Sequence, residues 1–176
     1  MTIRKVETNL CAIATKAIDN SKGNDEFITH LQTLNSNEID IAVFKLEQLI
    51  TPQIDCTKCG NCCKSLMINV EEIEAVNVAN FLKLERKEFD KKFIEKSENG
   101  KMVINKIPCH FLEDNKCTIY QNRFAGCKEF PALHLPQIQK RLFTIFMHYG
   151  RCPIIFNVME ELKLKVGFLL NIYRKN

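Results

Sequence analysis

Four cysteines fall within eight residues of this chain, and this cluster constrains the fold more than any other feature. The segment from Asp55 to Lys64 reads D-C-T-K-C-G-N-C-C-K and places a C-x-x-C-x-x-C-C motif at Cys56, Cys59, Cys62 and Cys63. Two-residue gaps let a tight turn bring both thiols of a pair onto one metal ion. Gly60 and Asn61 suit the left-handed or turn conformation that such a turn needs. The motif therefore predicts a metal-binding knuckle.

Four further cysteines lie downstream of the knuckle, at spacings too wide for a second motif of this kind. They are Cys109, Cys117, Cys127 and Cys152. They can reach the knuckle only if the chain folds back over it. The polar stretch 113–116 predicts a turn whose two sides carry Cys109 and Cys117, so these two thiols are expected to converge. Cys11 stands apart in an apolar helical pattern and is expected to be an ordinary buried thiol.

Eight thiols divide evenly into two tetrathiolate sites, the closed form typical of structural zinc. The side chains of the neighbours Cys62 and Cys63 point in different directions. They are therefore expected to serve two separate sites, or one of them bridges two metals. The preferred division places Cys56, Cys59 and Cys62 with one downstream thiol, and Cys63 with the other three. The C-x2-C-x2-C spacing also suits an iron–sulfur cluster, so zinc and iron remain alternatives. A Cys62–Cys63 disulfide acting as a redox switch is a third.

Several side chains near the cysteines are candidates for a supporting role. His110 follows Cys109, and His148 lies four residues before Cys152, so either imidazole could replace a thiolate or contact one. Arg123 and Lys128 could donate hydrogen bonds to anionic sulfurs.

The amino-acid composition limits the classes of protein to which this chain can belong. Nine cysteines in 176 residues is below the density of a disulfide scaffold. The first ten residues do not resemble a secretory signal, and no apolar stretch approaches membrane-spanning length, so reduced thiols in the cytoplasm are expected. The formal charge of +4 counts thiols as neutral, and eight thiolates with two divalent ions would bring it to zero. Metal ions are therefore the expected partners, with no nucleic acid and no membrane.

No motif in the chain indicates catalysis. A Gly-rich phosphate loop, a nucleophile elbow and an H-E-x-x-H helix are all missing from the sequence. A closed tetrathiolate site leaves no coordination position open for hydrolytic chemistry. The sequence therefore leans away from an enzyme.

Apolar periodicity predicts a mainly α fold with a small β-hairpin or strand element, centred on metal. Residues 1–52 are expected to form a helical N-terminal segment that covers the metal core, or else docks a partner, and residues 53–176 a cysteine-cluster metal-binding domain. Helices are expected at about 6–19, 25–34, 39–50, 72–82, 85–94 and 154–173, with a capping box at Asn69 and Glu72. Strands are expected at 66–68, 101–107 and 141–149.

The cysteine segments together resemble a known family. C-T-K-C-G-N-C-C, P-C-H-F-L, N-K-C-T-I-Y-Q-N-R and C-K-E-F-P are similar to the YkgJ-like cysteine-cluster family, described as zinc- or iron-chelating, over about residues 55–155. The resemblance implies a cytoplasmic bacterial protein. The ligands it implies are Cys56, Cys59, Cys62, Cys63, Cys109, Cys117 and Cys127, with Cys152 in a late C-P position. The family usually has Arg-Pro where Arg123-Phe124 stands here, and usually proline at the place of His110.

The leading hypothesis is thus a protein that holds zinc or iron through eight cysteine thiolates. A related cysteine motif in flagellin lysine methylases supports an alternative: an iron–sulfur redox enzyme, or an enzyme component, in protein modification. Metal delivery or storage is a third hypothesis, which requires labile binding.

Overall fold

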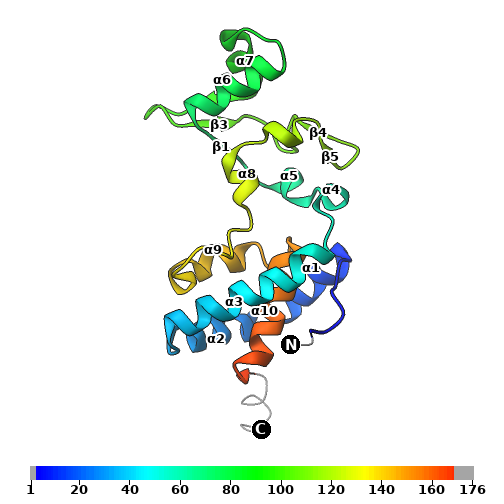
Figure 1. The fold of residues 1–176 in the computed structure, drawn as a ribbon, viewed down its shortest axis with the longest axis vertical. Coiled ribbons are helices and arrows are strands. Elements are labelled where there is room, and N and C mark those ends of the chain that lie inside the picture. The colour runs from blue at the N-terminus through cyan, green and yellow to red at the C-terminus, as the bar shows by residue number, and fades with distance from the viewer. Residues whose placement is uncertain (1–2, 169–176) are drawn as a thin grey trace. The chain divides into compact units, whose positions relative to one another are not determined.

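The computed structural model describes residues 3–168, which pack as two compact units (Figure 1). Of the described residues, 3–54 and 131–168 form the helical unit, and 55–130 form the cysteine unit. The described residues after 130 thus pack with the N-terminal helices. The predicted division into domains at residues 52 and 53 stays a prediction, because compact packing does not test independent folding.

The helical unit contains α-helices and short 3-10 turns. Its elements are α1 (Leu10–Asp19), α2 (Ser21–Gln32), α3 (Ser36–Ile50), η1 (Thr51–Gln53), η3 (Ile138–Arg141), α9 (Leu142–Met147) and α10 (Pro153–Lys165). The Asn9 side chain accepts from the Ala12 amide, and the Asn35 side chain from the amides of residues 37 and 38, so asparagines cap α1 and α3. Pro52 lies in η1, directly after α3 ends.

Helix α10 is the centre of the helical unit. Residues 153–159 are all buried, so this helix is covered on every side in its first two turns. It packs along α3 and touches α1, while α2 packs against α9. Phe27, Leu46 and Val158 are fully buried between these helices. Burying side chains of this size stabilises the fold by about 1.5–3 kcal/mol each.

Two sets of polar contacts join distant parts of the helical unit. The N-terminal segment is tied to α10 because the Asn157 amide accepts from the Glu7 backbone at 2.9 Å and donates to its carbonyl at 2.8 Å. Lys163, only 4% exposed, donates to Asn24 Oδ1 at 2.7 Å and to Glu160 Oε1 at 2.6 Å. The Tyr149 hydroxyl donates to the same Glu160 oxygen. A buried ammonium is thus paired and hydrogen-bonded, as such a group requires.

The cysteine unit combines short helices with two small antiparallel sheets. Its helical elements are α4 (Cys56–Cys59), α5 (Asn61–Ser65), α6 (Glu72–Phe81), α7 (Arg86–Phe93), η2 (Tyr120–Asn122) and α8 (Ala125–Glu129). Its strands are β1 (Asn69–Val70), β2 (Ile94–Lys96), β3 (Met102–Ile104), β4 (Leu112–Glu113) and β5 (Lys116–Cys117). The larger sheet has the order β1-β3-β2, with Val103 opposite both Asn69 and Glu95.

Local sequence explains these elements. Glu74 accepts from the Glu71 amide at 2.9 Å and closes the capping box that begins α6. Phe89 and Phe93 stand one helical turn apart on α7 and are both buried. The turn after β2 contains Gly100 at φ +80°, a conformation that suits glycine.

The predicted fold class, mainly α with small β elements, is confirmed, and several local predictions are wrong. Residues 141–149 form η3 and α9 instead of a strand, and the short strand lies at Asn69–Val70 instead of 66–68. The α6 capping box uses Glu71 and Glu74 instead of Asn69 and Glu72, and α2 begins at Ser21, four residues earlier than expected. Cys11 is exposed. The predicted helix beyond residue 168 lies outside the described residues. Within residues 3–168, no helix has the length and apolar character needed to cross a bilayer.

Candidate metal centre

The C-x-x-C-x-x-C-C motif folds into two short helices joined at Gly60. The Asp55 side chain accepts from the Thr57 amide at 3.0 Å and begins α4, which carries Cys56 and Cys59. Gly60 ends α4 at φ +59°, the left-handed conformation expected for this position, and α5 follows with Cys62 and Cys63. The turn thus bends the chain between the two thiol pairs, as a metal knuckle requires.

A two-residue hairpin brings the downstream thiols to the knuckle. Asp114 and Asn115 both have positive φ, the geometry of the tight turn that joins β4 to β5. The Cys109 amide donates to the Cys63 carbonyl at 2.8 Å, and α4 packs against β5, which contains Cys117. The structure therefore confirms that the chain folds back from Cys109 and Cys117 onto the knuckle.

Buried apolar residues hold the three downstream thiols of the cysteine unit in place. Phe111, Ile119 and Phe124 are all buried in one hydrophobic cluster. Each lies two or three residues from a downstream cysteine, and Cys109, Cys117 and Cys127 pack against the same cluster. The apolar core of this unit thereby positions sulfur atoms that are far apart in the sequence.

The thiols of the cysteine unit lie close enough to affect one another's ionisation. Burial raises the pKa of Cys127 to about 12, and nearby Cys109, Cys62 and Cys117 add to the effect. Burial, together with Cys62 and Cys59, raises the pKa of Cys56. Burial also raises the pKa of Cys109 and Cys117. These thiols favour the protonated form because burial disfavours a charged sulfur, and because thiolates in the cluster would repel one another.

The neighbouring pair Cys62 and Cys63 is the exception. Their Sγ atoms are 4.0 Å apart, within reach of a weak hydrogen bond. A hydrogen bond from Cys63 lowers the pKa of Cys62 to about 6 and raises that of Cys63. One thiolate is therefore favoured at neutral pH, and a divalent cation would stabilise the others.

Arg123 is the cation that acts on this group of thiols. Its positive charge lowers the pKa of Cys56, Cys62, Cys117 and Cys127 against the larger effect of burial. Its guanidinium carbon lies 4.0 Å from the centre of the Tyr120 ring. Lys128, the other predicted cation, is exposed.

The remaining predicted residues have other surroundings. Cys152 belongs to the helical unit, where it is 8% exposed and directly precedes α10, and His148 lies in the same unit. His110 packs edge-on against Phe93, and its Nε2 lies 2.7 Å from Asn105 Oδ1. That contact occupies one ring nitrogen of His110 with an amide. Ligation by Cys152, His110 or His148 stays a prediction.

The donor set suits zinc or iron, although the side chains are not arranged for a bound ion. No disulfide joins any of the nine cysteines. As the side chains stand, no group of three or more Cys, His, Asp or Glu within residues 3–168 has the geometry to hold a metal. Thiolates are the ligands that zinc and iron–sulfur centres prefer. The thiols fit such a metal by their chemistry and shared location, and loading requires them to rotate toward a common centre.

Two supporting contacts were not foreseen from the sequence. A Cβ at Gly60 would lie 2.9 Å from the Asn115 carbonyl oxygen, so the knuckle and the hairpin turn meet too closely for any other residue. The Glu74 carboxylate accepts from the Ala125 amide and thus fixes the start of α8, which carries Cys127. The glycine inside the cysteine motif was a signal in the sequence for the close approach of Gly60 to Asn115. Nothing in the sequence indicated the hydrogen bond between Glu74 and Ala125.

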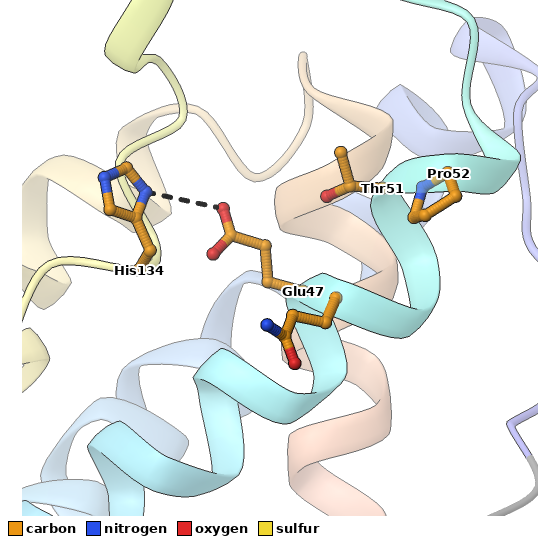
Figure 2. A pocket seen from close by; sticks show the side chains of 5 residues that line it. Glu47, Thr51, Pro52 and His134 are labelled. Atoms are coloured by element: carbon orange, nitrogen blue, oxygen red, sulfur yellow. Dashed lines mark ion pairs between the residues drawn. The ribbon is translucent and has the colours of Figure 1, made fainter.

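The helical unit has a surface pocket of about 550 Å³ whose lining contains no cysteine (Figure 2). It is lined by Glu47, Gln48, Thr51, Pro52 and His134. Figure 2 shows His134 facing Glu47, with 3.9 Å between Nδ1 and Oε1. Only these two lining residues are common metal ligands, fewer than the three that a catalytic zinc site uses. The thiols therefore form the stronger candidate site.

The fold and the clustered thiols together define a cysteine-rich protein of the metal-chelating class. Within that class, the chain belongs to the CxxCxxCC family ("Putative zinc- or iron-chelating domain"), whose sequence model matches residues 55–149. The match begins at Asp55, the residue that caps the first knuckle helix, and covers the whole cysteine unit. No solved structure matches this chain.

Proposed function

We propose that this protein binds two zinc or iron ions through the seven thiolates of the cysteine unit. These are Cys56, Cys59, Cys62, Cys63, Cys109, Cys117 and Cys127. The observation that supports the proposal most directly is the return of the 109–127 segment onto the knuckle, anchored by the Cys109–Cys63 backbone hydrogen bond. Family membership supports the choice of zinc or iron.

Seven thiolates are sufficient for two closed sites if one of them is shared. A bridging thiolate counts for both metals, so each ion obtains four sulfur ligands, the number found in structural zinc sites. Cys62 and Cys63 are the natural candidates for the bridge, because they are adjacent and only 4.0 Å separates their sulfurs. Cys152 is the ligand required by the competing arrangement, in which eight thiolates form two separate tetrathiolate sites.

Elemental analysis of anaerobically purified protein tests the proposal. We expect two metal ions per chain in the wild type and in Cys152→Ser, and fewer than two in Cys63→Ser. Cys11→Ser is the matched control, since Cys11 is exposed on α1. Loss of metal in Cys152→Ser would favour the eight-thiolate arrangement, and a wild type without metal would refute the proposal.

The colour of the same preparation identifies the metal. Colourless protein with stoichiometric zinc would exclude the iron–sulfur alternative. Brown protein that absorbs at about 400 nm would exclude zinc. Competition with a chelator then separates structural from delivery roles. Concerted unfolding as metal leaves indicates a structural centre, and loss of metal without unfolding indicates delivery.

A further inference from the structure

The residues on either side of Arg123 are anchored in the core of the cysteine unit. Ile119 and Phe124, on either side of the segment, are 1% and 2% exposed and belong to the hydrophobic cluster of the cysteine unit. The guanidinium also stacks on Tyr120. A side chain anchored in this way loses little further freedom when it forms a hydrogen bond.

The Arg123 Nε–H is a donor without an acceptor. The atom is buried, and among the described residues no hydrogen-bond partner lies within reach of it. Within residues 3–168 the side chain also has no hydrogen bond or carboxylate partner of any other kind. The Nε–H of Arg141 in the helical unit is also buried without a partner, but the terminal nitrogens of that side chain donate to the carbonyls of Ala132 and Leu135. A buried donor that is left unpaired costs free energy, so the Arg123 site favours an acceptor.

The groups around Arg123 indicate the chemical nature of the acceptor that the Nε–H would bind. Cys109, Cys117 and Cys127 pack against the same hydrophobic cluster as Ile119 and Phe124, the residues that flank the Arg123 segment. The positive charge of Arg123 also lowers the pKa of Cys117 and Cys127 against the larger effect of burial. A neutral thiol is a weak acceptor, whereas a thiolate is a charged one that strengthens the bond. Metal binding converts the thiols to thiolates.

We propose that Arg123 is a positioning residue of the metal centre, whose Nε–H donates to a metal-bound thiolate. This inference rests on the proposed function: metal binding converts the remaining thiols to thiolates, so the donor gains charged acceptors when the centre is loaded. Arg123 therefore stabilises the loaded protein more than the metal-free one. A residue that serves only to pack against Tyr120 would stabilise both states equally.

Affinity for zinc and cobalt(II), measured by chelator competition, tests this proposal with three variants. Arg123→Gln removes the charge and the buried donor, Arg123→Lys keeps the charge but loses the planar donor, and Lys128→Gln removes an exposed cation from the same segment. We expect both Arg123 variants to bind zinc about 10- to 100-fold more weakly, the range typical when a partner of a metal ligand is lost. We expect Lys128→Gln to bind as the wild type does.

Two further readouts separate positioning from packing. Thermal unfolding of the metal-free Arg123 variants should match or exceed the wild type, since an unpaired buried donor has been removed. In the cobalt(II) protein, the sulfur-to-cobalt charge-transfer band should move to lower energy in Arg123→Gln and Arg123→Lys, because a hydrogen bond no longer stabilises the thiolate. Equal losses of stability in both states, with unchanged affinity and spectrum, would overturn the inference. A wild type that binds neither metal would instead refute the proposed function.

Discussion

Replacing Gly60 by alanine tests whether the close approach of knuckle and hairpin builds the metal centre. Gly60 has φ +59°, and a left-handed residue with a Cβ costs about 1–2 kcal/mol. The added Cβ would also lie 2.9 Å from Asn115 O and 3.3 Å from Asn115 Cα. These are backbone atoms of a tight hairpin, which cannot rotate aside as a side chain can. Overpacking of this kind costs a further 1–3 kcal/mol, roughly.

Gly100→Ala is the matched control for this substitution. Gly100 has φ +80°, but a Cβ there would have nothing within 4 Å, so the substitution introduces backbone strain without a clash. Chemical denaturation of the metal-free variants gives the free energy of unfolding. We expect Gly60→Ala to lose about 1–3 kcal/mol more than Gly100→Ala, the contribution of the clash alone.

The same pair of variants links the contact to metal binding. Moving the hairpin away from Gly60 moves Cys117 away from the knuckle thiols, so Gly60→Ala should bind zinc more weakly in chelator competition. Gly100→Ala should retain the affinity of the wild type, since its turn joins β2 to β3 and carries no thiol. Equal losses of stability for the two variants, with equal zinc affinity, would refute the reasoning.

Three further predictions concern the helical unit and the loaded protein. Lys163→Met leaves the Glu160 carboxylate, whose side chain is only 19% exposed, without its cation. We expect the free energy of unfolding to fall by about 2–3 kcal/mol. The control Lys16→Met breaks a surface ion pair and should lower it by only about 0–1 kcal/mol. Equal losses would contradict the buried pair. Burial raises the pKa of Glu47 above its usual 4.5, and the charges of His134 and Arg141 oppose this in part. Folding therefore favours the protonated carboxyl, and its ionisation destabilises the folded protein as pH rises. Glu47→Gln should therefore be more stable than the wild type at pH 7, with the difference lost below about pH 4.5. A constant difference across pH would refute this. Removing metal with a chelator should lower the unfolding temperature of the wild type. Cys56→Ser, which removes a ligand from one of the two sites, should unfold between the loaded and the metal-free temperatures. An unchanged temperature would argue against a structural centre.

The sequence predicted helices correctly where the residues of the helix itself determine its structure. The helices around Leu46 and Phe89 were predicted because apolar spacing along a helix is a property of neighbouring residues. The segment from 141 to 149 was predicted as a strand from its aromatic and β-branched residues and forms α9 instead. Phe146 packs on Phe27 and Tyr149 in the folded unit, and such contacts override a weak β preference.

The sequence by itself determined the kind of donor, because thiols at two-residue spacing are suited to zinc and to iron. It also indicated the turn that carries Cys117 back. Only the tertiary structure decided which distant groups support the thiols. Gly60 meets Asn115, Glu74 holds the start of α8, and the Arg123 Nε–H is buried without an acceptor. Contacts of this kind depend on packing between segments far apart in the chain, which no local pattern of residues encodes.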